Sequence, residues 1–594
     1  MANYYVATNG SNGNNGISLA TPWATWQYGV SQLYPGDTLF IRAGNYTSMY
    51  GSSEGVNINP SSGRGRNGSS GIGNRITVQG YPGEAMPVLD CTSLTSGSEH
   101  NGMLIENLSY LDFKKLEIKN CKNRGSNQPA PGITFSYCSN INIEWCTLHD
   151  NDNGFISYSG NEIRFINCDS YSNGKGSPYL GNNGFYARCS ESNTTYFIGC
   201  RAWDNGQDGY DVFAAPGTGG GYIYWDKCWS FDNSQTYSGT GFKMGTNRAP
   251  SVSSNPQRVL TNCISVNNPI GYDESQDEGL GYSVPISIYN CVSYNNTAGF
   301  NFQWYEGLEG SFYPDIIKNC ISYQDGTLSL NNWKEHGTNR TIPNVIENNS
   351  WNIRTVQESD FINTEYSQLY NQRQEDGSLP IITFLHLSAA ATDFITAGAD
   401  VDLSTDGEGN NYDANHPSIG CYQYNAGSPV PVEEINVTAS EATITTNDGT
   451  LQMSAEILPE DSTYQNILWS VVPGSGTASI NSSGLLSALT NGTVTVRADA
   501  LDSSGVYGTM EITISNQLTD IKVTSLILSG GNSITVNAGT LQKYVTALPE
   551  NATDKSVTWS IYNGTGNATI DQNGLITAVR NGIVTVRVTA NDSI

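Results

Sequence analysis

Short runs in which apolar and polar residues alternate recur through the first half of the chain and predict β-strands. Examples are the apolar positions at Ile163, Phe165 and Ile166, and the pair Ile286 and Ile288. Each run precedes a cysteine. The cysteines recur every 22 to 35 residues, at Cys121, Cys146, Cys168, Cys200, Cys228, Cys263, Cys291 and Cys320. A repeat of this length, with several short strands in each copy, predicts a parallel β-helix with one coil per repeat.

Two further positions of the repeat are nearly constant. Five residues after the cysteine stands an asparagine, at Asn151, Asn173, Asn205, Asn233, Asn268 and Asn296. A glycine-aromatic pair also recurs, at 154–155, 184–185, 209–210, 241–242, 271–272 and 299–300. An asparagine side chain at a turn can hydrogen-bond to the next coil, and free cysteine packs as a small apolar side chain. All three columns are therefore predicted to be structural, with the cysteines as buried thiols rather than disulfides.

The segments on either side of the repeat predict a cap and a different C-terminal region. Residues 4–7 and 38–41 are strand-like, and 23–33 has helical apolar spacing, which suits a cap on the open end of a solenoid. Residues 326–415 lose the clear period. Further strands are expected at 381–385 and 420–424 because both segments are rich in apolar residues.

The last part of the chain is a tandem repeat with a shift of 90 residues. Trp469 recurs as Trp559, and the strand-like run 493–497 recurs as 583–587. Alternating strands with one tryptophan per copy predict two β-sandwiches, which resemble group 2 bacterial immunoglobulin-like domains. The chain is thus expected to be all-β. Its predicted parts are the β-helix with its cap at 1–425, a linker at 426–433, and sandwiches at 434–516 and 517–594, the second one truncated.

Composition and charge limit the classes of partner. The formal net charge is -27, which argues against nucleic acid held by general electrostatics. No apolar run approaches the roughly 20 residues that span a bilayer. The first residues lack the basic and apolar regions of a signal peptide, and we interpret them as the mature N-terminus of a secreted protein. A polyanionic substrate would need a local source of positive charge.

Charged residues interrupt one column in the middle of the array. Two positions after the repeat glycine the chain carries Ile156, Tyr186, Asp211, Lys243, Asp273 and Asn301. If the coils stack in register, these side chains project into one row, with Asp208 and Gln207 on the preceding turn and Asn183 one coil earlier. Residues that are one repeat apart in the sequence then become neighbours in space. We therefore predict that the active site lies at this row of side chains.

Oxygen ligands beside a lysine suit one reaction in particular. Asp, Asn and Gln oxygens can bind Ca²⁺, and a lysine close to a divalent cation can have its pKa lowered enough to act as a base. β-Elimination from a uronate polymer needs both parts: a cation on the C5 carboxylate and a base for the C5 proton. The alternatives are an ordinary surface lysine with turn aspartates, a glycosidase that uses Asp208 and Asp211 as its carboxylate pair, and a non-catalytic carbohydrate-binding adhesin.

Three stretches of this site region carry a family resemblance. The Gly-Phe-Lys-Met-Gly stretch at 241–245, the Asn-Gly-Gln-Asp-Gly-Tyr-Asp stretch at 205–211 and the segment 373–380 resemble polysaccharide lyase family 9. The resemblance covers roughly residues 1–425. It implies a right-handed parallel β-helix, Lys243 as base, and Asp208 and Asp211 as calcium ligands. The family pattern has acids where this chain has Asn183 and Gln207, and each lost carboxylate weakens a calcium site.

The expected function is thus a secreted, calcium-assisted lyase for a uronic-acid polysaccharide. Pectate-like polymers come first, and rhamnogalacturonan or a bacterial sheath or exopolysaccharide are alternatives. The expected metal ligands are Asn183, Asp208 and Asp211, and four residues on or after the same row are expected to bind sugar: Arg248, Asp273, Asn301 and Trp304. We expect a monomer, with the immunoglobulin-like domains available to a cell wall or surface polymer.

Overall fold

The structure is a computed structural model that describes most of residues 2–591. The residues left out of the description are 48–53, 64, 72, 95–100, 123–129, 176–181, 190–192, 215–220, 235–238, 246–257, 275–284, 303–314, 331–344, 375, 414, 416, 425–431, 448, 461, 463–466, 482, 501–503 and 518–521. The chain divides into two compact units, Met1–Pro429 and Val430–Ile594.

Three parallel sheets, named A, B and C here, build the first unit. The strands of sheet A are β1 (Asn3–Val6), β2 (Thr38–Ile41), β5 (Ile76–Gly80), β8 (Ser109–Lys114), β11 (Ser139–Glu144), β14 (Asn161–Ile166), β17 (Thr194–Ile198), β20 (Tyr222–Asp226), β23 (Arg258–Thr261), β26 (Ile286–Tyr289), β29 (Ile316–Lys318) and β32 (Val345–Glu347). The strands of sheet B are β3 (Asn45–Tyr46), β6 (Val88–Asp90), β9 (Glu117–Lys119), β12 (Thr147–His149), β15 (Asp169–Tyr171), β18 (Arg201–Trp203), β21 (Trp229–Phe231), β24 (Ile264–Val266), β27 (Val292–Tyr294) and β30 (Ile321–Tyr323). The strands of sheet C are β4 (Glu54–Ile58), β7 (Asn101–Glu106), β10 (Pro131–Ser136), β13 (Asn153–Tyr158), β16 (Phe185–Cys189), β19 (Tyr210–Ala214), β22 (Thr240–Lys243), β25 (Ile270–Asp273), β28 (Ala298–Asn301) and β31 (Thr327–Ser329).

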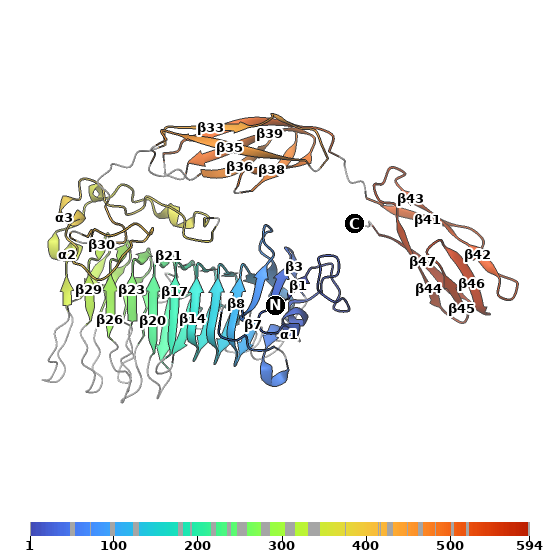
Figure 1. The fold of residues 1–594 in the computed structure, drawn as a ribbon, viewed down its shortest axis with the longest axis horizontal. Helices are drawn as coiled ribbons and strands as arrows, with labels where there is room; N and C mark the ends of the chain where they lie inside the picture. The colour runs from blue at the N-terminus through green and yellow to red at the C-terminus, as the bar shows by residue number, and fades with distance from the viewer. Residues whose placement is uncertain are drawn as a thin grey trace. The chain divides into compact units, whose positions relative to one another are not determined.

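These sheets form a parallel β-helix, as the repeat predicts. Along most of the array the chain visits sheets A, B and C once per coil, so that each strand pairs with the strand one coil away. In Figure 1 the sheet A strands β14, β17, β20, β23, β26 and β29 stand next to one another in chain order, and β11 separates β14 from β8. Residues with positive φ turn the chain at the corners, for example Trp145 before β12 and Asp150 after it.

Aromatic side chains from sheet C fill the interior. The rings of Phe155, Phe185, Tyr210, Phe242, Tyr272 and Phe300 stack in order, with centroids 4.8–5.1 Å apart and planes within 11° of one another. The glycine before each ring lies against the next coil: a Cβ on Gly209 would come within 2.1 Å of Ser230 Oγ and 2.9 Å of the Gly241 carbonyl oxygen. The glycine-aromatic column therefore sets the close stacking, as predicted.

The asparagine column is a ladder of buried side chains. Asn205 Oδ1 accepts from the backbone N–H and the side-chain amide of Asn173, and Asn205 Nδ2 donates to Asn233 Oδ1. The left-handed backbone lies one residue before the asparagine, at residues such as Asp204 and Asp232. The ladder asparagines bridge the coils with their side chains, while their neighbours make the turn.

The cysteine column needs one correction. Cys146 through Cys320 follow the corner between sheets A and B, but register pairs Thr147 with Glu117, which places Leu116 rather than Cys121 in this column. Cys121 instead lies in the asparagine column, where its N–H donates to Asn151 Oδ1. All cysteines in the described part of the chain are buried and free, which confirms the prediction of thiols.

The N-terminal cap is present as expected. Helix α1 (Trp26–Gln32) begins at Thr25, whose side chain accepts from the Tyr28 N–H, and it buries Trp26, Gly29 and Val30. The helix contacts β1, β2 and β4 and covers the apolar end of the coil stack.

The segment after the array covers the outer face of sheet B. It contains α2 (Ser350–Ile353), α3 (Thr392–Ile395) and two 3₁₀ turns, Glu358–Asp360 and Tyr366–Tyr370. The predicted strands at 381–385 and 420–424 are wrong: the first makes only an isolated bridge between Phe384 and Asn363, and the second is a bend. Their apolar side chains pack onto sheet B rather than pairing in a ladder.

A buried ion cluster fastens this segment. Asp169 on β15 accepts from Arg201 at 2.8 and 2.9 Å and from Arg373 at 2.7 Å. Arg201 also donates to the Leu369 and Asn371 carbonyl oxygens. The two guanidinium groups hold the pKa of Asp169 far below its usual value, even though burial alone would raise it. Arg373, the first residue of the segment 373–380, therefore has a structural role here.

The second unit contains two sandwiches, whose strands pair antiparallel except that β34 pairs parallel with β40. The first comprises β33 (Glu434–Ala439), β34 (Thr443–Ile444), β35 (Thr450–Leu458), β36 (Ile467–Pro473), β37 (Thr477–Ile480), β38 (Leu485–Thr490), β39 (Gly492–Ala500) and β40 (Tyr507–Ile514). The second comprises β41 (Ser525–Ser529), β42 (Thr540–Gln542), β43 (Tyr544–Leu548), β44 (Val557–Asn563), β45 (Asn567–Ile570), β46 (Leu575–Arg580) and β47 (Val584–Ala590). β39 pairs with β36 and β40, whereas β47 pairs within the described residues only with β44. The domain boundaries given above stay predictions, and the predicted linker lies mostly outside the described residues.

Candidate active site

The outer face of sheet C carries the predicted row. Asp211 on β19 pairs with Lys243 on β22, and Lys243 pairs with Asp273 on β25. Tyr186 and Asn301 extend the row by one coil on either side. Because successive side chains of a strand point to opposite faces, the stacked rings point inward and the following residue points outward. The sequence prediction that these side chains are neighbours is therefore confirmed.

Lys243 lies between two carboxylates. Its Nζ is 3.4 Å from Asp208 Oδ2 and 3.5 Å from Asp211 Oδ1. The Asp208 side chain is fully buried and that of Asp211 is 9% exposed, whereas Lys243 keeps 24% of its side chain accessible. The amine is thus the most accessible charged group of the three.

Asn183 and Thr240 hold the carboxylates in place. Asn183 Nδ2 donates to Asp211 Oδ2 at 2.9 Å, and its Oδ1 accepts from the Asp208 N–H at 3.1 Å. The Thr240 N–H donates to Asp208 Oδ1 at 2.7 Å. Thr240 occupies the position before the repeat glycine, as Asp208 does one coil earlier and Asn183 two coils earlier. That shared position is the sequence signal that could have identified it.

Burial and charge perturb both partners of the ion pair. The two carboxylates, Asp211 first, raise the pKa of Lys243 despite its burial. Burial raises the pKa of Asp208 to about 7, against its usual value of 3.8, and the lysine offsets only part of that rise. A single cation faces two carboxylates, so the fully buried Asp208 holds a proton more readily than an exposed aspartate. The sequence predicts a lowered Lys243 pKa beside a divalent cation. With only the protein side chains around it, the Lys243 pKa is raised instead.

The oxygen atoms of this cluster fit a small calcium site. Within the described residues, Asp211 Oδ1 is buried and accepts no hydrogen bond, and Asp208 Oδ2 accepts from the Lys243 amine. Carboxylate and amide oxygens are the ligands that Ca²⁺ prefers. No group of three or more His, Cys, Asp or Glu side chains arranged for a metal ion occurs among the described residues. Among the residues that the structure describes, the site would therefore depend on two carboxylates and the Asn183 amide.

The other predicted residues are spread around this centre. Asn301 Nδ2 donates to Asp273 Oδ1 at 2.9 Å, so these two form a polar pair on the C-terminal side of Lys243. Gln207 is half-buried, and its N–H donates to the Asn182 carbonyl oxygen. Arg248 and Trp304 lie outside the described residues, and their predicted role in sugar binding stays a prediction.

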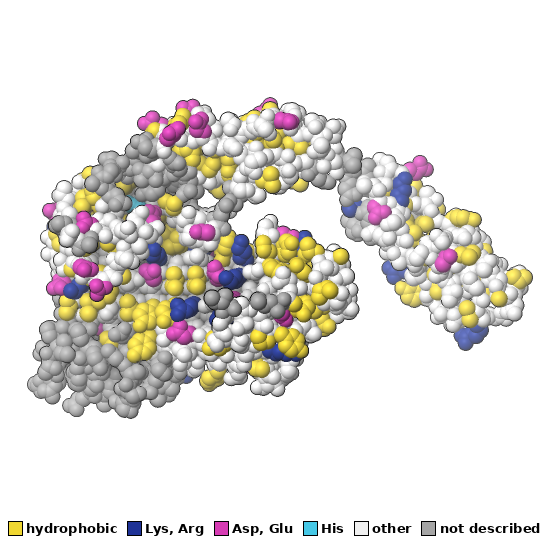
Figure 2. Space-filling view, viewed as in Figure 1, with side chains coloured by type: hydrophobic (Ala, Val, Ile, Leu, Met, Phe, Trp, Pro, Cys, Tyr) yellow, Lys and Arg dark blue, Asp and Glu magenta, His cyan; other side chains and the backbone are white. Residues whose placement is uncertain are grey.

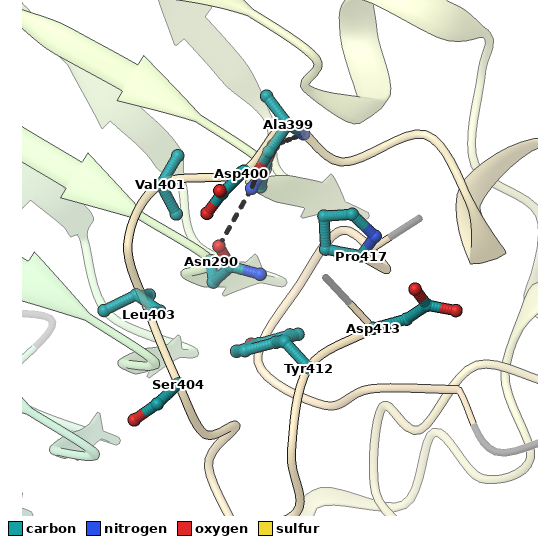
Figure 3. A pocket seen from close by; sticks show the side chains of 10 residues that line it. Asn290, Ala399, Asp400, Val401, Leu403, Ser404, Tyr412, Asp413 and Pro417 are labelled. Carbon is teal, nitrogen blue, oxygen red and sulfur yellow. Dashed lines mark hydrogen bonds between the residues drawn. The ribbon is translucent and has the colours of Figure 1, made fainter. Parts of the chain in front are cut away.

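A separate cavity of about 150 Å³ lies at the corner between sheets A and B, away from the face that carries Lys243. Figure 3 shows Asn290, Tyr412 and the segment from Ala399 to Ser404 around it. Asn290 donates to the Ser418 and Gly420 carbonyl oxygens, and Tyr412 donates to Asn262 Oδ1. Its polar groups fasten the covering segment, so we assign this cavity to the scaffold.

On the face that Figure 2 shows, the described side chains form no broad positive field that would attract a polyanion. On the face visible in Figure 2, Lys and Arg side chains occur in small groups interspersed with Asp and Glu. Within the described part of the chain, no helix is long and apolar enough to cross a membrane. A polyanionic ligand would therefore depend on local groups.

Known proteins are similar to this chain over about two thirds to three quarters of its length. Pectate lyase L of Dickeya dadantii is 24% identical over 71% of this chain and 90% of its own length. The crystal structure of pectate lyase Pel9A matches 72% of this chain and 97% of its own, with a TM-score of 0.56 and 24% identity. A structure titled rhamnogalacturonan lyase matches 66% of this chain and 97% of its own, with a TM-score of 0.54 and 23% identity.

Family assignments agree with these likenesses. The model of the bacterial Ig-like domain (group 2) matches residues 431–510 and 522–593, which contain most of the first sandwich and all of the second. The model described as Pel9A-like, right handed beta helix region matches residues 4–339, more than half of the sequence, including Lys243, Asp208 and Asp211. The chain therefore belongs to the Pel9A-like right-handed β-helix family and carries two group 2 bacterial immunoglobulin-like domains.

Proposed function

We propose that this chain is a secreted polysaccharide lyase that cleaves a uronic-acid-containing, pectate-like polymer by β-elimination, with Lys243 as the base. Family membership and the lyase names of its relatives support the reaction class. The observation that carries the proposal is the position of Lys243: a partly accessible amine held between two buried carboxylates on the outer face of a β-helix.

The reaction is an elimination in which the protein supplies a base. Lys243, in its neutral form, takes the proton from C5 of the uronate, which lies next to the carboxylate. The electrons of the C5–H bond form the C4–C5 double bond, and the C4–O bond breaks. The departing oxygen keeps the electron pair of that bond and takes a proton from solvent. The product carries a 4,5-unsaturated end.

Asp208, Asp211 and Asn183 position the base. Asp208 and Asp211 hold the amine at 3.4 and 3.5 Å, and Asn183 fixes the two acids through one hydrogen bond to each residue. The same three residues would hold Ca²⁺. When bound, that ion would neutralise the substrate carboxylate and stabilise the negative charge that develops beside it.

The carboxylate pair is less suited to hydrolysis. The two oxygens that face Lys243 are at most about 7 Å apart, which is at or below the lower end of the roughly 6.5–9.5 Å that inverting glycosidases use to admit a water. The lysine amine also lies between them. Elimination therefore accounts for all three charged groups, whereas hydrolysis leaves the amine without a role.

The proposed reaction also indicates the class of substrate and the place where the protein acts. The substrate is an acidic polysaccharide, with rhamnogalacturonan or a bacterial sheath or exopolysaccharide as alternatives to pectate. The immunoglobulin-like domains suit contact with a cell wall or surface polymer, and the protein acts as a monomer outside the cell.

The test compares wild type with Lys243→Met on polygalacturonate and rhamnogalacturonan. Ultraviolet absorbance reports unsaturated ends, and a reducing-end assay reports all cleavage. Removal of a general base is expected to slow turnover by roughly 10²–10⁴-fold. The matched control is Lys114→Met, which removes a lysine paired with Glu144 on sheet A. Each assay is repeated with a chelator and with added calcium.

Three results would contradict the proposal. Reducing ends without absorbance would mean hydrolysis. Full activity of Lys243→Met would show that Lys243 is not the base. A lack of both signals on every uronate polymer would favour a carbohydrate-binding protein without catalytic activity.

A further inference from the structure

Three side chains on the outer face of sheet C lie on the N-terminal side of the Lys243 site. Tyr186 on β16 pairs with Asp211, so it occupies the same row one coil earlier. Tyr158 on β13 pairs with Arg188 on β16. All three side chains are half-buried and therefore reach solvent beside the site. They form one continuous surface with the row that carries Asp211 and Lys243.

The chemistry of this surface fits a sugar acid. The rings of Tyr158 and Tyr186 meet edge to face, with centroids 5.9 Å apart and planes at 66°. Within the described part of the chain, neither the Arg188 guanidinium nor the Tyr186 hydroxyl has a hydrogen-bond or ion-pair partner. An arginine without a partner among the described residues is notable in a chain of net charge -27. Guanidinium groups bind carboxylates in a two-pronged geometry, and aromatic rings pack against sugar faces.

The coil spacing indicates how a polymer would reach this surface. Adjacent parallel strands lie about 4.7–4.9 Å apart, close to the length of one pyranose ring. A chain lying along the row would place successive sugars over successive coils. From Lys243 toward the N-terminus these are the coil of Asp211 and then the coil of Tyr186 and Arg188. On the other side, the Asp273 carboxylate bonded to Asn301 would repel a uronate.

We propose that Tyr158, Tyr186 and Arg188 form a second subsite, which binds a uronate one or two residues along the polymer from the one that Lys243 attacks. Arg188 binds the carboxylate of that sugar, and the tyrosine pair packs against its ring. The proposal rests on the proposed function because both sites hold the same chain. It adds a specificity: the preferred polymer carries a second uronate close to the cleaved one.

Binding is measured in the inactive Lys243→Met protein, so that turnover does not interfere. Calorimetry compares digalacturonate, tetragalacturonate and the neutral tetrasaccharide of galactose. We expect tetragalacturonate to bind more tightly than the other two. Adding Arg188→Met is expected to weaken tetragalacturonate binding about 10–100-fold, the range for losing a hydrogen bond to a charged group, and to leave the neutral tetrasaccharide unchanged. Arg188→Lys is expected to restore part of the loss.

Matched controls come from the outer face of sheet A. Arg164 lies over the Tyr196 ring at 4.1 Å, and Tyr196 stacks on Tyr224 at 5.2 Å, so this face also combines an arginine with a tyrosine pair. Arg164→Met and Tyr224→Ala are expected to leave tetragalacturonate binding unchanged, whereas Tyr186→Ala weakens it.

The outcomes separate this subsite from the proposed function. Equal binding of di- and tetragalacturonate, or an Arg188→Met protein that binds like its parent, would overturn the subsite even if wild type is an active lyase. Conversely, binding that depends on Arg188 in a protein that produces no unsaturated ends would support the subsite and overturn the lyase assignment.

Discussion

Replacement of Asp208 by asparagine tests the electrostatics of the site directly. Asp208 is fully buried, and burial raises its pKa from 3.8 to about 7. Because the folded protein binds this proton more tightly than the unfolded chain, the stability associated with Asp208 is present below pH 4 and is lost as the pH rises through 7. At 1.36 kcal/mol per pKa unit the loss is roughly 4 kcal/mol. The asparagine side chain of the Asp208→Asn variant does not titrate, so the variant does not undergo this loss of stability.

The assay is calorimetric unfolding of wild type and Asp208→Asn between pH 4 and pH 8, with a chelator present. For a unit of 429 residues that unfolds with about 2.1 cal/mol/K per residue, roughly 4 kcal/mol corresponds to about 4–5 °C in Tm. We therefore expect the difference in Tm, variant minus wild type, to increase by about 4–5 °C between pH 4 and pH 8. The activity of the variant is expected to be lower than that of wild type. A group kept at such a cost in stability is expected at a functional site rather than in the scaffold.

A flat difference across this pH range would refute the reasoning, because it would mean that Asp208 titrates alike in both states. A difference of the opposite sign would mean that Lys243 stabilises the Asp208 carboxylate more than burial destabilises it. Added calcium is expected to raise the Tm of wild type more than that of Asp208→Asn, since a ligand stabilises the state that binds it. An equal response to calcium would argue against Asp208 as a ligand.

The remaining predictions concern the scaffold and the second unit. Asp169→Asn leaves Arg201 and Arg373 buried without their carboxylate and is expected to cost about 3–5 kcal/mol near neutral pH. Because the Asp169 pKa is lowered, wild type should lose this advantage only as the pH falls below 4, as acid unfolding of the two proteins would show. Asn205→Ala removes the acceptor of two Asn173 donors and is expected to lower the free energy of unfolding by about 1–3 kcal/mol for each donor left unpaired, measured in denaturant. A chain ended after residue 429 retains every described site residue and should keep wild-type turnover on soluble polymer; a large loss would assign the second unit a part in catalysis.

The periodicity of the sequence predicted the scaffold and the neighbours within the site. In a β-helix the same positions of successive coils stack, so Asp211, Lys243 and Asp273 could be placed in one row from their spacing alone. In residues 326–415, where the repeat is lost, a high content of apolar residues did not predict strands correctly. Segment 381–385 is apolar because it packs on sheet B, and the same composition would suit a strand. Cys121 was misplaced because two corner positions of the coil both accept small buried side chains.

The sequence by itself therefore determined the coil, its structural columns and the group of residues that meet on sheet C, because these depend on local repetition. Only the tertiary structure decided how the charges behave. Whether Asp208 is fully buried, whether Lys243 faces one carboxylate or two, and whether Arg188 has a partner all depend on side chains brought together from separate coils and on the water they exclude. The solvation of a side chain and the electrostatic potential around it depend on all the groups that surround it, and a repeat pattern does not contain that information.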